Sequence, residues 1–579
     1  RLGVLHLVMP HGRHETALAE RLLEDLFGLT ISRVGGVCLR EKLSLGGIVT
    51  RLQQNTPFGG KSLTLKQVRR ALCVMEQHSL VDFRIELSVG GSSRIIYSTK
   101  IDSVLDLAMY PRACLIAKKL FTTTAEAICE ELSAQGRLCF SETIRRVRTR
   151  LDVPYSDVKQ KFSWLAEAQF IARVPPLEGQ FKLRGCPVFS DNDNKYVLPD
   201  EIMKMPTGEF EAPAPAKPNG FSIEEDIKPD VSQLNLTSRK RKHASSNSPE
   251  AMTESDPDAN ILWRINIPRF RRYVRDEIVL DMVCGGGSAD TMDSSHQQQV
   301  NSMRALLKVA EVRVPSLYAV TTPAITLMDV LRSAKDAGLE VEKRDLEWSL
   351  GQLVDDSRGI LRRAGDSGGG LFLLDFERAI SLAAEMHVES LLREQVDSKA
   401  VRIRRLLQAR KYLEEDAIEK AVMLPSKQTR ELLYSMLEEN YVAVKSFGKT
   451  NDFAAARTIS LFHVDPARTA RSVLENTCQM LHNLIVRRQH EAKDKKTLVE
   501  NEIKTEAIIA KIEADEALDE ESKEQQKSEV EQLYMAGAKR KELHLFQKGQ
   551  ALLHAAEIEA ERVLFTLQMY LHFASRSAP

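Results

Sequence analysis

Four stretches of the chain share one pattern of apolar positions. In each stretch, residues at i, i+4 and i+7 fall on one face of a helix, and an apolar run typical of a strand follows. Their spacing is too long and uneven for a solenoid, so the repeat predicts separate small domains. The stretches are Leu63–Phe83 (with Val68, Leu72 and Met75 on the face), Val153–Arg173 (Val158, Phe162, Leu165), Val341–Leu361 (Leu346, Leu350, Leu353, with a longer loop) and Leu424–Val444 (Thr429, Leu433, Met436).

The last stretch shows most clearly what is repeated. Pro425 suits the first turn of a helix, where its missing N–H group is no loss. Asn440 ends the helix, and Tyr441 and Val442 begin a strand. A helix-turn-helix followed by a strand pair is the plan of a winged helix, whose second helix often enters a DNA groove. A single copy would fit any small α+β domain, whereas four copies favour winged helices.

These patterns predict a mainly α protein with small β wings, built of tandem winged-helix modules and a long antiparallel helical hairpin. A short strand carrying Trp263 opens the third module in this prediction. The predicted parts are a first module at 1–100, a second at 101–175, an insertion at 176–258, a third module at 259–378, a fourth at 379–465, and the hairpin at 466–579.

The insertion is rich in Pro, Ser, Asn, Asp and Glu, and it loses all hydrophobic periodicity. Such a composition buries too little apolar surface to offset the entropy of ordering, so we predict disorder there. A basic tetrad in this stretch fits a nuclear import signal, and a solvated charge run explains it equally well. The tetrad is Arg239, Lys240, Arg241 and Lys242.

In the last part of the chain, apolar residues recur at alternating spacings of three and four positions, which predicts a coiled-coil seam. An acidic stretch at 514–528 separates two arms, each of which would be roughly 75 Å long as a helix. A homodimer is the alternative, and the two short seams favour pairing within one chain. The predicted seam residues are Leu474, Leu481, Ile485, Leu553, Val563, Leu567 and Tyr570.

Composition narrows the function. The 579 residues are 43% hydrophobic and 28% charged, which fits several globular domains, about three to five. Lys and Arg number 81, as do Asp and Glu, so bulk charge does not favour coating of nucleic acid. The eight cysteines form no CxxC pair, which predicts neither zinc nor disulfides. No apolar run reaches the roughly 20 residues of a membrane helix.

Catalytic motifs are weak. Gly365–Gly369 spells GDSGG, the surroundings of a protease serine, but that chemistry needs a His and an Asp placed by a β-barrel. We interpret it as the turn of a wing. Gly285–Gly287 precedes no GK[ST], so it predicts no phosphate loop. We therefore expect no catalytic residue, cofactor or metal.

Basic residues on the predicted modules are candidate phosphate contacts, which position a duplex without reading its bases. The alternative for each is a solvated helix face that pairs with Glu. Asn and Gln are scarce on these helices, which disfavours base-specific readout. The candidates are Lys66, Arg69, Arg70, Arg145, Arg146, Arg148, Lys159, Lys161, Arg404, Arg405, Lys427, Arg430 and Lys449.

Serial winged helices that end in a helical hairpin resemble the winged-helix subunits of RNA polymerase III. These are the largest members of its initiation heterotrimer and relatives of the alpha subunit of TFIIE. The likeness is closest over Arg402–Asp465, clear at Trp263–Asp281 and Leu63–Phe83, and covers most of the chain outside the insertion.

The resemblance implies a non-catalytic nuclear subunit. It implies binding to the polymerase clamp through the hairpin, two smaller partner subunits, and a place near promoter DNA at the upstream edge of the bubble. There the subunit would help recruit the initiation factor and stabilise the melted DNA. Nothing in the resemblance involves a membrane.

Two other classes stay open at this stage. A winged-helix scaffold of the cullin or PCI type binds proteins and no nucleic acid, but its helical arm precedes the winged helix. A free factor like TFIIE alpha would carry a zinc ribbon, and the absence of CxxC pairs counts against it.

Overall fold

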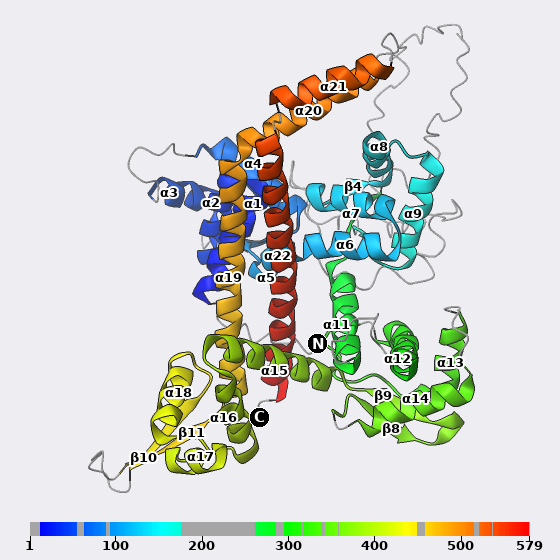
Figure 1. The fold of residues 1–579 in the computed structure, drawn as a ribbon. Helices are drawn as coiled ribbons and strands as arrows, with labels where there is room; N and C mark the ends of the chain where they lie inside the picture. The colour runs from blue at the N-terminus through cyan, green and yellow to red at the C-terminus, as the bar shows by residue number, and fades with distance from the viewer. Residues whose placement is uncertain are drawn as a thin grey trace, which may run out of the picture. The chain divides into compact units, whose positions relative to one another are not determined.

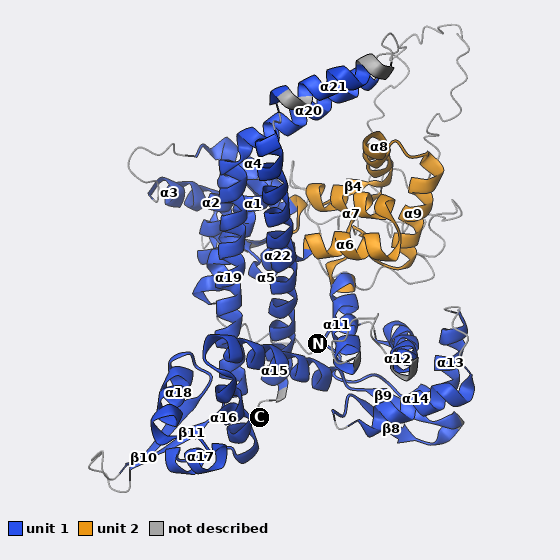
Figure 2. Ribbon diagram, viewed as in Figure 1, with its two compact units in different colours: residues 1–76, 80–109, 270–579 blue, residues 77–79, 110–269 orange. Residues whose placement is uncertain are grey.

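A computed structural model shows a mainly helical chain with four small antiparallel sheets among its described residues (Figure 1). It forms two compact units (Figure 2): unit 1 holds residues 1–76, 80–109 and 270–579, and unit 2 holds 77–79 and 110–269. The predicted fold class is confirmed, and the number of winged-helix domains stays a prediction. The structure describes residues 12–54, 63–87, 93–174, 261–284, 294–314, 316–336, 342–356, 358–448, 458–514, 520–534 and 537–577. The predicted insertion, its basic tetrad (Arg239–Lys242) and Lys449 lie outside these ranges.

The first module combines four helices with a sheet of order β1-β3-β2. The apolar triplet of its fourth helix is buried, as the periodicity predicts. The elements are α1 (Arg13–Phe27), α2 (Leu29–Arg40), β1 (Leu43–Ser44), α3 (Leu45–Gln54), α4 (Leu65–Gln77), β2 (Val81–Leu87) and β3 (Ser93–Thr99), followed by α5 (Ile101–Leu105) and η1 (Asp106–Met109).

Unit 2 corrects one predicted boundary. The strand of Trp263, assigned above to the third module, pairs with both strands of the second, in the order β4-β6-β5. Trp263 is buried there and meets the Phe162 ring edge-on at 5.1 Å. The second module therefore takes its central strand from beyond the insertion. Its elements are α6 (Tyr110–Leu120), α7 (Thr123–Gln135), β4 (Leu138–Cys139), α8 (Phe140–Leu151), α9 (Tyr155–Glu167), β5 (Ile171–Arg173) and β6 (Leu262–Ile265).

The third module begins with α11, which starts at the end of unit 2. Residues 365–369 run from the last residue of β8 through η6 in the turn before β9, so the GDSGG run belongs to a wing. The elements are α11 (Ile267–Cys284), α12 (Ser294–Arg313), β7 (Ile325–Thr326), α13 (Leu327–Asp336), α14 (Lys343–Asp355), β8 (Leu361–Gly365), η6 (Ser367–Gly369) and β9 (Leu371–Leu374).

The fourth module follows directly, and Asp375 caps its first helix by accepting a hydrogen bond from the Arg378 N–H group. Its two long strands pair from Ala443 with His463 to Gly448 with Thr458. The elements are α15 (Phe376–Gln395), α16 (Ser398–Arg410), α17 (Glu415–Val422), α18 (Ser426–Glu438), β10 (Ala443–Gly448) and β11 (Thr458–His463).

The C-terminal helices form the predicted hairpin, but in two tiers rather than two unbroken arms. The inner tier pairs α19 (Pro466–Asp494) with α22 (Gly537–Ser577), and the outer tier pairs α20 (Lys496–Ala514) with α21 (Glu520–Tyr534). The helix is interrupted at Lys495, whose N–H group donates a hydrogen bond to the Glu491 carbonyl oxygen. Among the described residues of α20 and α21, only Leu498 and Thr505 are buried, so the outer tier has little core to keep it in line with the inner one.

The inner tier is part of the core of unit 1. Five predicted seam residues are buried, while Val563 and Tyr570 are half-buried. Because α22 packs on α15 as well as on α19, its burial extends around the helix at Leu564, Phe565 and Met569. A helix that is apolar all round belongs to a core rather than to a free arm. The buried seam residues are Leu474, Leu481, Ile485, Leu553 and Leu567.

Candidate nucleic-acid interface

The same backbone path leads into and out of the second helix of the helix-turn-helix in different modules. Before α9 and α18, a residue in the left-handed region, Asp152 or Met423, precedes a proline by two positions. Each donates its N–H to the carbonyl four residues earlier, at 2.9 and 3.0 Å. The shared geometry makes positions on α9 and α18 directly comparable.

The exit from these helices repeats in three modules. Ser79, Gln169 and Asn440 have positive φ and lie two residues after the ends of α4, α9 and α18. The next residue then donates its N–H to the carbonyl five positions back at 2.8–2.9 Å, which turns the chain into the wing. The third module differs, since a longer turn through Gly359 follows α14. This difference matches the longer loop seen in its sequence.

The outward face of α4 holds three cations. Lys66, Arg69 and Arg70 are exposed within one and a half turns of this helix. Among the described residues, none of the three makes an ion pair or hydrogen bond. Glu76 is the only acidic residue of α4. Free guanidinium and ammonium groups in this arrangement are what phosphate contacts require.

The basic residues of unit 2 are mostly engaged within it. Arg145 and Arg146 both donate to Glu142, at 2.6–2.8 Å. These hydrogen bonds lower the pKa of the Glu142 carboxyl to about 2. Arg148 is half-buried. On α9, the Lys161 ammonium lies 3.8 Å from the Trp164 ring centroid, while Lys159 lies 5.9 Å from that of Tyr155.

Arg404 is not a surface residue, which corrects its prediction as a phosphate contact. Its side chain is 1% exposed, and its Nη1 lies 3.4 Å from the Tyr441 carbonyl oxygen. Burial lowers the pKa of the guanidinium, while Glu385 and Glu389 oppose that shift. The position lies on the apolar face of α16, between Ala400 and Leu407, so helical periodicity carries the signal for its burial.

The other basic candidates of the fourth module reach solvent. Arg405 donates its Nε to Glu389 at 2.8 Å, and Arg430 donates its Nε to Glu415 at the same distance. Lys427 is exposed and makes no ion pair with any described residue. Arg430 and Lys427 therefore present charge on α18, but with carboxylates beside them.

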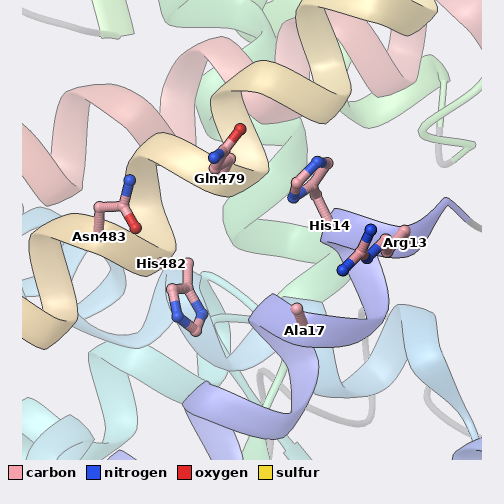
Figure 3. A pocket seen from close by; sticks show the side chains of 6 residues that line it. All are labelled: Arg13, His14, Ala17, Gln479, His482 and Asn483. Carbon is pink, nitrogen blue, oxygen red and sulfur yellow. The ribbon is translucent and has the colours of Figure 1, made fainter.

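A pocket of about 350 Å³ lies between α1 and α19 in unit 1 (Figure 3). It is lined by Arg13, His14 and Ala17 from α1, and by Gln479, His482 and Asn483 from α19. The His482 Nδ1 atom is buried and has no hydrogen-bond partner among the described residues. The sequence did not point to this pocket, because its two sides lie more than 460 residues apart.

A carboxylate caps the N-terminus of α1 beside this pocket. Glu475 on α19 accepts a hydrogen bond from the His14 N–H group at 3.0 Å, so it caps α1 from a distant part of the chain. The described residues contain no cluster of three potential metal ligands. None of the described helices is both long and apolar enough to cross a membrane.

Comparison with known proteins adds to this geometry. The model of the POLR3C C-terminal winged-helix domain matches residues 388–464, and that of RNA polymerase III subunit RPC82 matches residues 204–382. DNA-directed RNA polymerase III subunit RPC3 of Homo sapiens is 28% identical, with 96% of this chain and 98% of the relative aligned. The Danio rerio RPC3 subunit is 29% identical, with 97% of this chain and 99% of the relative aligned. The Dictyostelium discoideum rpc3 subunit is 20% identical over 42% of this chain. The resemblance seen in the sequence is thus confirmed, and the chain is related to the RPC3 and RPC82 subunits of RNA polymerase III.

Proposed function

We propose that this chain is a non-catalytic subunit of nuclear RNA polymerase III. The relatives that align over nearly the full chain are named as subunits of that enzyme. The matching domains include a winged helix at residues 388–464, which fits binding rather than chemistry. We propose further that the hairpin binds the polymerase clamp and that the modules bind two smaller subunits.

Purification of the tagged chain from nuclear extract tests this level of the proposal. Mass spectrometry should recover the polymerase III core and two smaller subunits in stoichiometric amounts. Recovery of ubiquitin-ligase or translation scaffolds in their place would contradict the proposal and favour the cullin or PCI class.

Within the assembly, we propose that the first module contacts promoter DNA at initiation, near the upstream edge of the bubble. The observation that carries this proposal is the charge of α4, which has three basic residues and one acidic residue. The corresponding helices are balanced or acidic: α9 and α18 have two of each, and α14 has two basic and three acidic residues. Of these four helices, only α4 therefore combines a net positive charge with cations that have no partner in the described part of the chain.

The test is a triple variant, Lys66→Ala, Arg69→Ala and Arg70→Ala, in the assembled polymerase. Its binding to a bubble-containing promoter duplex is measured over a range of salt concentrations. If all three residues contact phosphates, the slope of log K against log salt should fall by up to about three.

A matched control replaces Arg145, Arg146 and Arg150, which already pair with Glu130, Glu131 or Glu142. It removes the same charge, yet it should change the slope far less. An α4 variant with the slope of the wild type would show that the α4 cations are ordinary surface charge.

A further inference from the structure

We propose that the outward face of α18 is a docking surface for a protein segment that carries an apolar side chain next to a carboxylate. The surface consists of Met423, Lys427, Arg430 and Tyr434, called here the α18 stripe. The inference rests on the proposed function in one respect, since it assigns this segment to another subunit or factor of the same transcription assembly.

Three of the four residues share one face of α18. Lys427, Arg430 and Tyr434 follow one another at i, i+3 and i+7 within this helix, and Met423 lies in the turn before it. An open hollow of about 730 Å³ lies along the same face, lined by Ser426, Lys427, Arg430, Glu431, Tyr434 and Ser435. The stripe therefore combines two cations and an aromatic residue beside a shallow hollow, with a methionine just before the helix.

The two large apolar side chains of the stripe are exposed. Met423 is 85% exposed and Tyr434 is 56% exposed. At the positions that correspond to Tyr434, α4 has Cys73 and α9 has the buried Ser163. Exposed aromatic and methionine side chains are typical of the anchors of protein interfaces.

Met423 occupies a backbone conformation that its side chain disfavours. Its φ of 59° lies in the left-handed region, which residues other than Gly, Asn and Asp rarely adopt. At the corresponding turn of the second module, Asp152 takes this conformation. Folding alone does not account for a strained methionine that is also exposed, whereas a role in contacting a partner does.

The charges favour a carboxylate in the groove. Lys427 has no ion-pair partner among the described residues, and Arg430 has one carboxylate, Glu415, while its own side chain stays 59% exposed. An acidic side chain of the partner would bind between these two cations. Nucleic acid fits less well, because its row of phosphates would also approach Glu431 and Glu415, whereas a single carboxylate can contact Lys427 and Arg430 alone. At the position of Glu431, α4 has Arg70.

The first experiment locates the partner. The full chain, with the photoreactive amino acid p-benzoylphenylalanine in place of Tyr434, is assembled into polymerase III and irradiated with promoter DNA and initiation factor present. We expect a cross-link to a peptide of another protein that contains Asp or Glu near an apolar residue. A cross-link to DNA, or none at Tyr434, would overturn the proposal.

The second experiment measures binding with the cross-linked peptide made synthetically and labelled for fluorescence anisotropy. Tyr434→Ala, Lys427→Glu and Met423→Asn in the full chain should each weaken binding by about tenfold or more. Trp164→Ala is the matched control, since it removes an exposed aromatic residue from the corresponding helix α9. It should leave binding unchanged.

Met423→Asn separates binding from folding. Asn tolerates the left-handed conformation, so the variant should unfold at the same temperature as the wild type or a higher one while its affinity for the peptide falls. Wild-type affinity in all three variants would sink the proposal. Failure of the proposed function is a different result, because the chain would then not copurify with polymerase III at all.

Discussion

The second and fourth modules turn their chains in the same way with very different residues. After α7, Gly136 has φ 74° and ψ −57°; after α16, Lys411 has φ 67° and ψ −67°. In both turns the following N–H group bonds the carbonyl two residues back, at 2.9 and 3.0 Å. This is the γ-turn with positive φ, which is rare and strained for any residue with a side chain.

The surroundings explain why only one of these turns needs glycine. A Cβ atom at Gly136 would lie 2.6 Å from the Gln77 carbonyl oxygen and 2.9 Å from the His78 Nδ1 atom. Lys411 is exposed, so its side chain extends into solvent. The second module therefore requires glycine for both conformation and space, whereas the fourth module bears only the conformational strain.

The comparison teaches that the fold dictates the backbone and that the environment selects the side chain. Asp152 and Met423 form a second such pair, in the turn before the next helix. In both pairs the residue that tolerates positive φ is in the second module. The fourth module thus retains strain at two exposed positions, as expected of a surface selected for something besides stability.

The largest expected effect comes from Gly136→Ala. The added methyl group meets the Gln77 carbonyl and fixes a disfavoured φ, so the free energy of unfolding of unit 2 should fall by about 2–4 kcal/mol. Urea denaturation of the full chain, followed by the fluorescence of the buried Trp263, measures this change. Gly351→Ala on α14 is the control, since no atom of a described residue lies within 4 Å of its Cβ position, and it should stabilise slightly. Equal changes in the free energy of unfolding after the two substitutions would show that the turn at Gly136 does not require glycine.

Acid should weaken the same turn of the second module. Burial, followed by the charge of Arg137, lowers the pKa of His78 from 6.5 to about 4. Since the folded state binds the proton less readily than the unfolded state, stability is fully present above pH 6.5. It is lost as the pH falls from about 6.5 towards 4, by up to about 3 kcal/mol.

The test compares wild type with His78→Gln by urea denaturation at pH 7.5, 5.5 and 4.5. The wild type should lose more stability than the variant over this range, because Gln carries no titrating group. An identical loss in both proteins would assign the acid sensitivity to other residues.

Periodicity predicted much of the fold because burial of a helix face depends on local spacing. All twelve apolar-face residues of the four repeated helices are buried. The sequence did not predict that Trp263 belongs to the second module, since its strand partners lie on the other side of the insertion. The interruption of the helix at Lys495 was also not predicted. An apolar seam indicates that two helices pair, but it does not indicate where weaker packing ends that pairing.

The candidate interface was predictable only in part. The charge of α4 follows directly from its sequence, but the ion pairs that engage Arg405 and Arg430 involve carboxylates 16 and 15 residues away, on other helices. Such pairings depend on tertiary structure, which no local rule supplies. The exposure of Met423 and Tyr434 was not predicted. Tyr434 lies outside the buried face of α18, and Met423 lies in the turn before this helix.

The smallest expected effect concerns Lys411, in the corresponding γ-turn of the fourth module. Lys411→Gly should relieve the strained φ of the γ-turn, a gain of about 1–2 kcal/mol, offset in part by the larger chain entropy of glycine when unfolded. The net increase in the free energy of unfolding should be about 0.5–1 kcal/mol, measured by urea denaturation. Lys411→Ala removes the same charge and side chain but keeps a Cβ atom, so it should give no gain. If Ala stabilises as much as Gly, the lysine side chain and not the backbone is the source of the strain, and the parallel with Gly136 fails.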